Sequence, residues 1–324
     1  MDQKPGLRRE RPKDAISTAP PPKTRRIPLP NVAPKPVSED PEAPGRLAAI
    51  LESPTYREAF ADVEFLARRE TRGMRLLLDY AKTESCLQDK HVDATIVVFG
   101  STRLREPAVA EAHFEQARSA LAEHPDDPVL RERAAIAERL ARNSGYYEVA
   151  REFARRVNRL QRPPASQRLW IMTGGGPGIM EAANRGSFDV GAESIGLNIT
   201  LPHEQYPNPY ITPGLCFRFH YFATRKFHFL QRARALVAFP GGYGTFDELF
   251  ETLALIQTRV MAPVPVILVG TAYWRQAVNI DFLVAEGVID PEDRELFWYA
   301  ETASEIWDGI QEWHRLNGTP LPIG

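Results

Sequence analysis

The chain has 324 residues, 43% of them hydrophobic, which suits one large α/β domain or two small ones. Its 40 basic and 42 acidic residues nearly balance, so charge gives no reason to expect nucleic acid or an anionic membrane as a partner. Cys86 and Cys216 lack metal-ligand spacing, no apolar run approaches the roughly 20 residues that span a bilayer, and no secretory signal is visible. We therefore expect a cytoplasmic protein.

Residues 1–45 differ in composition from the rest of the chain. They hold 11 of the 28 prolines and almost no large apolar side chains. Such a segment cannot bury enough surface to offset its ordering entropy, so a disordered tail is predicted. Its pairs Arg8-Arg9 and Arg25-Arg26 offer contacts to an acidic partner, which leaves a scaffold role as an alternative to a merely solvated tail.

A helical extension is predicted over residues 46–91, where it would cover a sheet or form an oligomer contact. Ser53 is expected to cap the second of its helices, with Pro54 in the first turn. Apolar residues at helical spacing mark three helices: Leu47, Ile50 and Leu51; Phe60, Val63, Leu66 and Ala67; Leu76, Leu77 and Tyr80.

Five short apolar runs, separated mostly by helical patterns, predict buried parallel strands. The first, Thr95 to Phe99, ends in Gly100-Ser101, and the others lie at residues 169–172, 195–199, 235–239 and 264–269. A helical insertion over about residues 104–165 is expected to break near residues 124–128 and then to continue as one long helix from 129 to 160. The alternation predicts an α/β fold over residues 92–317, a Rossmann-like doubly wound parallel sheet with helices on both faces. Residues 318–324 would form a short C-terminal tail.

Two glycine-rich loops each follow a predicted strand and open a helix. The first contains Gly174, Gly175, Gly176 and Gly178, and the second contains Gly241, Gly242, Tyr243, Gly244 and Thr245. Glycines let the backbone turn sharply and approach a ligand, and the free N–H groups of a helix N-terminus attract phosphate. Because ligands bind at the carboxyl ends of such strands, we expect both loops to face one crevice.

The loops do not fit the larger phosphate ligands. The third position of the dinucleotide pattern G-x-G-x-x-G/A is Glu181 in the first loop and Asp247 in the second, where a carboxylate would crowd the contact between helix and strand. No G-x-x-x-x-G-K-[ST] motif is present, which argues against a nucleoside triphosphatase. A nucleoside monophosphate is the simplest remaining interpretation.

Charged residues near the loops have structural and functional interpretations. Thr245 to Glu248 forms a Thr-x-x-Glu pattern, which taken alone favours a capping box, whereas Glu251 one turn later would place two carboxylates in one crevice. Arg225 and Lys226 lie in an aromatic stretch, where one of them is expected to turn toward an anion. His220 and His228 show no metal pattern and are interpreted as surface or core histidines.

These motifs, in this order, resemble the LOG family. They are the stretch Gly-Gly-Gly-Pro-Gly-Ile-Met-Glu-Ala at 174–182, Arg225-Lys226, and Pro-Gly-Gly-Tyr-Gly-Thr-x-x-Glu at 240–248, and the resemblance covers roughly residues 92–315. The family includes cytokinin riboside 5′-monophosphate phosphoribohydrolases and bacterial nucleotide nucleosidases. It often carries the label lysine decarboxylase, but no lysine motif for pyridoxal phosphate is visible here.

The resemblance implies a homodimeric enzyme that hydrolyses the N-glycosidic bond of a nucleoside 5′-monophosphate. This reaction requires no metal or redox cofactor, and the balanced charge gives no reason to expect a nucleic-acid or membrane partner. Glu248 and Arg225 match the family's catalytic residues, and Glu204 in Leu-Pro-x-Glu matches a substrate-binding residue. The loop from Gly241 to Thr245 would hold the phosphate, and the remaining predicted substrate-binding residues are Ser101, Gly174, Gly175, Gly176, Gly178, Lys226 and Glu251.

Two departures from compact plant-type members bear on the base. The helical insertion and the N-terminal region are longer, and Ala254 replaces a threonine that those members carry after the motif. They favour an AMP nucleosidase-like activity over a dedicated cytokinin enzyme. The alternative is a nucleotide-binding sensor or carrier that uses the same crevice without catalysis.

Overall fold

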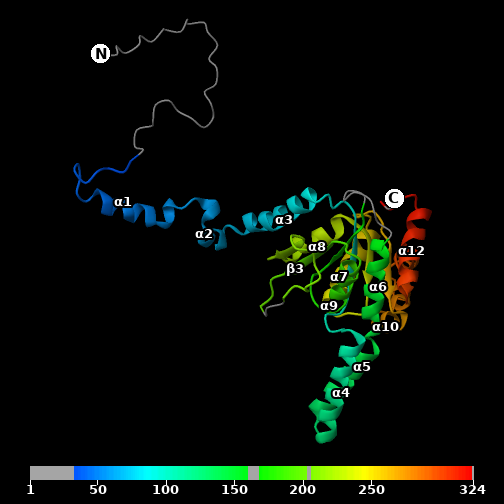
Figure 1. Ribbon diagram of the computed structural model, residues 1–324. Coiled ribbons are helices and arrows are strands. Elements are labelled where there is room, and N and C mark those ends of the chain that lie inside the picture. The colour runs from blue at the N-terminus through cyan, green and yellow to red at the C-terminus, as the bar shows by residue number, and fades with distance from the viewer. Residues whose placement is uncertain (1–32, 160–167, 203–205, 323–324) are drawn as a thin grey trace, which may run out of the picture. The chain divides into compact units, whose positions relative to one another are not determined.

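The computed structural model describes residues 33–159, 168–202 and 206–322 (Figure 1). The chain divides into two compact units, one up to Thr71 and one from Arg72 onward. The predicted tail lies largely outside the described residues, as do Glu204 and the end of the predicted insertion. Among the described residues, no helix combines the length and apolarity that crossing a membrane requires.

The first unit is built from short helices. It contains α1 (Ala43–Glu52), the 3₁₀ turns η1 (Pro54–Tyr56) and η2 (Ala59–Ala61), and α2 (Val63–Ala67). Ser53 caps as predicted, accepting a hydrogen bond from the Thr55 N–H, but it opens only a single 3₁₀ turn. The second predicted helix is therefore wrong in extent, because Asp62 caps a new helix in the middle of its apolar pattern.

The second unit contains a sheet of seven parallel strands in the order β4-β3-β2-β1-β5-β6-β7. The strands are β1 (Thr95–Phe99), β2 (Trp170–Thr173), β3 (Ser194–Ile199), β4 (Cys216–Phe219), β5 (Ala233–Ala238), β6 (Val266–Val269) and β7 (Trp298–Ala300). The five predicted strands and the α/β fold with a doubly wound parallel sheet are confirmed, whereas β4 and β7 were not predicted.

Helices cover both faces of the sheet. On one face, α6 (Gly145–Arg159), α7 (Ile179–Asp189) and α12 (Ala303–Leu316) share a core with alternate residues of the strands, such as Ile96 and Val98. On the other face, α3 (Arg72–Asp89), α8 (Phe222–Gln231), α9 (Tyr243–Gln257) and α10 (Thr271–Ala277) pack against Val97 and Phe99. The helix α11 (Ile280–Ala285) and the 3₁₀ segment η4 (Pro291–Leu296) lead to β7.

The insertion between β1 and β2 contains three helices. α4 (Pro107–Glu123) and α5 (Pro128–Arg142) lie side by side, and the predicted break between them is confirmed, with Asp127 as the cap of α5 (Figure 1). The predicted single helix from 129 to 160 is wrong. It is interrupted after Arg142, because Asn143 ends α5 and the Ser144 hydroxyl donates to the Ala141 carbonyl (2.6 Å) before α6 begins.

The strand order creates a crevice at the carboxyl end of the sheet. The chain builds outward from β1 to β4 and then returns to add β5 on the opposite side of β1. The loops that follow β1 and β5 therefore diverge, and ligands of open α/β sheets bind at such a point. The second glycine-rich loop follows β5, so the topology brings it beside Ser101.

Candidate active site

A cavity of about 600 Å³ opens at this crevice. The loops after β1, β2, β3 and β5 contribute to its wall, together with the first turns of α7, α8 and α9. The lining residues are Phe99, Gly100, Ser101, Thr102, Arg103, Gly174, Met180, Asn198, Ile199, Leu201, Phe222, Arg225, Gly242, Tyr243, Gly244, Thr245 and Glu248. The two glycine-rich loops thus face the same cavity.

The second loop presents a helix N-terminus to the cavity. Gly242 is the N-cap of α9 in an extended conformation, so Tyr243 and Gly244 are the first helical residues. Their N–H groups have no acceptor within the helix, and the helix dipole favours an anion beside them. A Cβ on Gly241 would lie 2.1 Å from the Thr245 Oγ1, so the tight loop requires glycine there.

The predicted capping box is wrong. The N-cap of α9 is Gly242, three residues before Thr245, and that threonine is already helical, with its N–H donating to the Gly242 carbonyl (2.9 Å). Glu248 therefore lies in the second turn, where its side chain does not cap the helix. It contacts Arg225 of α8 instead, with 3.4 Å between Oε1 and a terminal guanidinium nitrogen.

Glu248, which is buried, and Arg225, which is partly buried, form a pair at the cavity wall. Glu248 is only 3% exposed, and this burial raises the pKa of its carboxyl to about 7, although Arg225 and Lys226 act in the opposite direction. Burial also lowers the pKa of Arg225, whose guanidinium lies 5.3 Å from the ring centres of both Phe222 and Phe229. The Arg225 Nε is buried without a hydrogen-bond acceptor among the described residues.

Lys226 has a different role from Arg225 in the structure. Its Nζ lies 2.8 Å from Asp247 and 3.0 Å from Glu251, and neither Lys226 nor Glu251 lines the cavity. Burial lowers the pKa of Lys226, but the two carboxylates outweigh it and the net direction is upward. Of the two adjacent cations, Arg225 is therefore the one that turns toward the cavity.

The first glycine-rich loop serves mainly to pack the β1 loop against α7. The Ile179 N–H, the first of α7, donates to the Ser101 carbonyl (3.1 Å), so protein already occupies this helix N-terminus. Gly178 has φ +76°, and a Cβ there would lie 2.2 Å from the same carbonyl oxygen. Gly174 is the glycine of this loop that lines the cavity.

The structure thus gathers some predicted site residues and separates others. Ser101, Gly174, Arg225, Glu248 and the segment from Gly242 to Thr245 line the cavity, whereas Glu204 lies outside the described residues. Predicted residues that do not line it are Gly175, Gly176, Gly178, Lys226, Gly241 and Glu251.

Sequence reasoning missed Arg103, Asn198 and Phe222, of which Asn198 could have been found as a polar residue near the end of a predicted strand. His228 is confirmed as a core histidine, because its ring stacks on Tyr80 at 4.9 Å. No group of three or more metal-ligand side chains comes together in the part of the chain that the structure describes.

Comparison with known sequences identifies the family to which this chain is similar. A family model described as "Possible lysine decarboxylase" matches residues 180–310. The probable cytokinin riboside 5′-monophosphate phosphoribohydrolase LOGL3 of Oryza sativa subsp. japonica is 30% identical over 44% of this chain and 68% of its own length. The cytokinin riboside 5′-monophosphate phosphoribohydrolase LOG3 of Arabidopsis thaliana is 30% identical over 46% of this chain and 69% of its own length.

A solved structure, the X-ray structure of TM1055, is 20% identical and covers 68% of this chain and 99% of its own, with a TM-score of 0.42. The matched plant sequences carry names that describe nucleotide phosphoribohydrolases. On the identity and coverage of these relatives, the chain belongs to the LOG family.

Proposed function

We propose that this protein hydrolyses the N-glycosidic bond of a purine nucleoside 5′-monophosphate, AMP or an N6-substituted form of it, to the free base and ribose 5-phosphate. The observation that carries the proposal is the Glu248–Arg225 pair beside the N-terminus of α9, within one cavity. The plant relatives are named as cytokinin riboside 5′-monophosphate phosphoribohydrolases, which supports hydrolysis of this kind of substrate.

The α9 N-terminus supplies the phosphate site in this scheme. The N–H groups of Tyr243 and Gly244 bind the dianion, and the phosphate anchors the nucleotide at a distance from the reacting C1′. Glu248 lies one turn further along the same helix, so a ribose attached to that phosphate falls beside its carboxylate. Binding energy from the phosphate thus positions the glycosidic bond.

Glycosidic cleavage passes through a ribose that resembles an oxocarbenium ion, while negative charge builds on the departing base. In its ionised form, Glu248 stabilises the cation by holding the ribose hydroxyls or orients the attacking water. Arg225 is a poor proton donor because its pKa is too high, so it acts electrostatically on Glu248 and on the leaving base. The scheme requires no metal or redox cofactor.

The test is to incubate the full chain with purine and pyrimidine monophosphates and to quantify free base and ribose 5-phosphate by chromatography. Wild type should release both products in equal amounts, and Glu248→Gln should release neither while still binding AMP. Glu312→Gln, which removes the carboxylate of an exposed Arg–Glu pair on α12, is the matched control and should retain activity. Binding of AMP by wild type without any release of base would indicate a sensor or carrier instead.

A further inference from the structure

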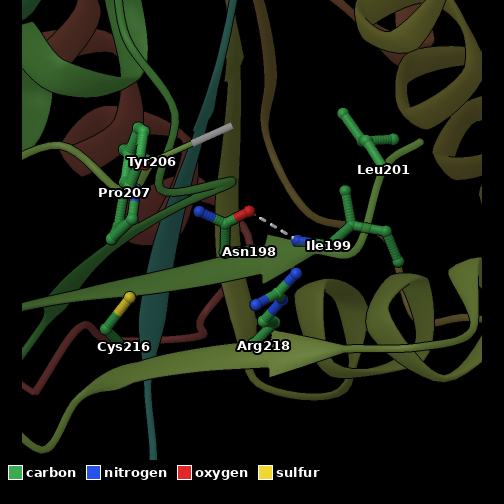
Figure 2. A pocket seen from close by; sticks show the side chains of 7 residues that line it. All are labelled: Asn198, Ile199, Leu201, Tyr206, Pro207, Cys216 and Arg218. Atoms are coloured by element: carbon green, nitrogen blue, oxygen red, sulfur yellow. Dashed lines mark hydrogen bonds between the residues drawn. The ribbon is translucent and has the colours of Figure 1, made fainter. Parts of the chain in front are cut away.

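A smaller pocket of about 140 Å³ lies beside the cavity at the β3–β4 edge of the sheet, and it has no part in the scheme above. Asn198, Ile199 and Leu201 line both spaces, so the two are adjacent. Figure 2 shows Asn198, Cys216 and Arg218 on neighbouring strands, with Tyr206 and Pro207 above them.

The pocket exists because this edge of the sheet is open on one face. In β4, Phe217 and Phe219 are buried in the core, whereas Cys216 and Arg218 alternate with them and are exposed. Asn198 is the register partner of Arg218, so both side chains lie on the open face. A fully covered parallel sheet would have no such space.

Asn198 presents a hydrogen-bond donor to this pocket. The residue is only 4% exposed, and its Oδ1 accepts from the Ile199 N–H at 2.7 Å. Because a backbone N–H cannot accept, this contact fixes the amide with Nδ2 on the opposite side (Figure 2). Nδ2 donates to no atom of the described residues, so it is available to an acceptor in the pocket.

The Asn198 pocket lies where the base of a nucleotide would fall if its phosphate were bound at the N-terminus of α9. From β5, which leads into α9, to β3 is three inter-strand steps, about 14 Å at roughly 4.8 Å each. That span is on the scale of an extended nucleoside monophosphate from phosphate to base. Glu248 and Arg225 line the same cavity as the α9 N-terminus and Asn198.

We propose that this side pocket recognises the base: Asn198 Nδ2 donates a hydrogen bond to an acceptor on the edge of the purine, and the space beside Cys216 receives a substituent on its exocyclic amine. The inference rests on the proposed function, since it assumes a nucleotide with its phosphate at α9. It adds the residue that distinguishes one base from another.

The first experiment measures binding to the inactive Glu248→Gln chain by calorimetry. Adding Asn198→Ala should weaken AMP binding by about 5- to 150-fold, because a hydrogen bond to a buried group is lost. It should leave the affinity for ribose 5-phosphate, which has no base, unchanged. An equal loss for both ligands would show that Asn198 only supports the fold of the cavity, and would overturn the inference.

The second experiment needs no variant at position 198. Alkylation of the exposed Cys216 in the Glu248→Gln chain is followed by mass spectrometry of its peptide, at alkaline pH because burial raises the pKa of this thiol. N6-benzyl-AMP should slow the alkylation, half-maximally at its dissociation constant, and ribose 5-phosphate should not. Binding without protection overturns this inference alone, whereas failure of every nucleotide to bind overturns the proposed function as well.

Discussion

Replacing Glu248 by glutamine should stabilise the folded chain above neutral pH, although it removes the proposed catalytic group. Burial raises the pKa of this carboxyl from its ordinary 4.5 to about 7, and each pKa unit corresponds to about 1.4 kcal/mol. The folded chain therefore holds a proton at pH values where the unfolded chain has released it. Wild-type stability falls as pH rises from 4.5 to 7, by roughly 3 kcal/mol in all. Glutamine has no proton to lose.

The assay is urea unfolding of both chains at pH 5 and pH 8, followed by tryptophan fluorescence. Relative to wild type, the Glu248→Gln chain should gain roughly 2–3 kcal/mol between the two pH values. Glu312→Gln is the control: a hydrogen bond from Arg315 lowers the pKa of Glu312 below its ordinary 4.5, so this carboxylate is ionised at both pH values and its removal should leave the pH dependence of stability unchanged. A difference between Glu248→Gln and wild type that is the same at both pH values would refute the reasoning.

Three further outcomes follow from the same contacts. The kcat/KM for AMP should fall as pH drops through about 7, because protonation of Glu248 removes its charge; a rate independent of pH between 5.5 and 8.5 would contradict this. Arg225→Met should lower kcat about 100- to 1000-fold and move that pH midpoint upward, since the guanidinium holds the pKa of Glu248 down; a midpoint that moves downward would argue against the pair. Gly178→Ala should destabilise the chain by about 1–3 kcal/mol more than Gly191→Ala in thermal unfolding. The two glycines have similar positive φ, but a Cβ at Gly178 would clash with the β1 loop whereas Gly191 has open space around it. Equal losses of stability would show that the β1 loop moves aside to accept the methyl group.

The central strands were predictable because parallel strands covered on both faces are continuous apolar runs, as in β1. β4 was not, since it alternates buried Phe217 with exposed Cys216 and Arg218 and resembles an irregular aromatic stretch. The helix break after Arg142 depended on the competing hydrogen bond of the Ser144 hydroxyl, which a periodic apolar pattern does not reveal.

The glycine motifs predicted where the cavity would be, but they did not predict which of the two helix N-termini is free to bind a ligand. Whether a helix N-terminus is free for a ligand depends on what else approaches it, and the Ser101 carbonyl reaches α7 from a loop 78 residues earlier in the chain. Glu248 looked like a cap because the pattern was placed three residues too late on the helix. The burial of Glu248 and its contact with Arg225 depend on tertiary packing, which the local sequence does not reveal.

The position of the cavity between β1 and β5 also bears on how the chain acquires it during synthesis. Val98 pairs with Val237, 139 positions later, whereas its partner on the other side, Thr173, is 75 positions away. Contacts of such long range form late because closing the intervening loop costs entropy before any pairing compensates for it. A nascent chain can therefore assemble the β1–β4 half while its nucleotide cavity still lacks one wall, and only the arrival of β5 and α9 completes a surface able to bind phosphate.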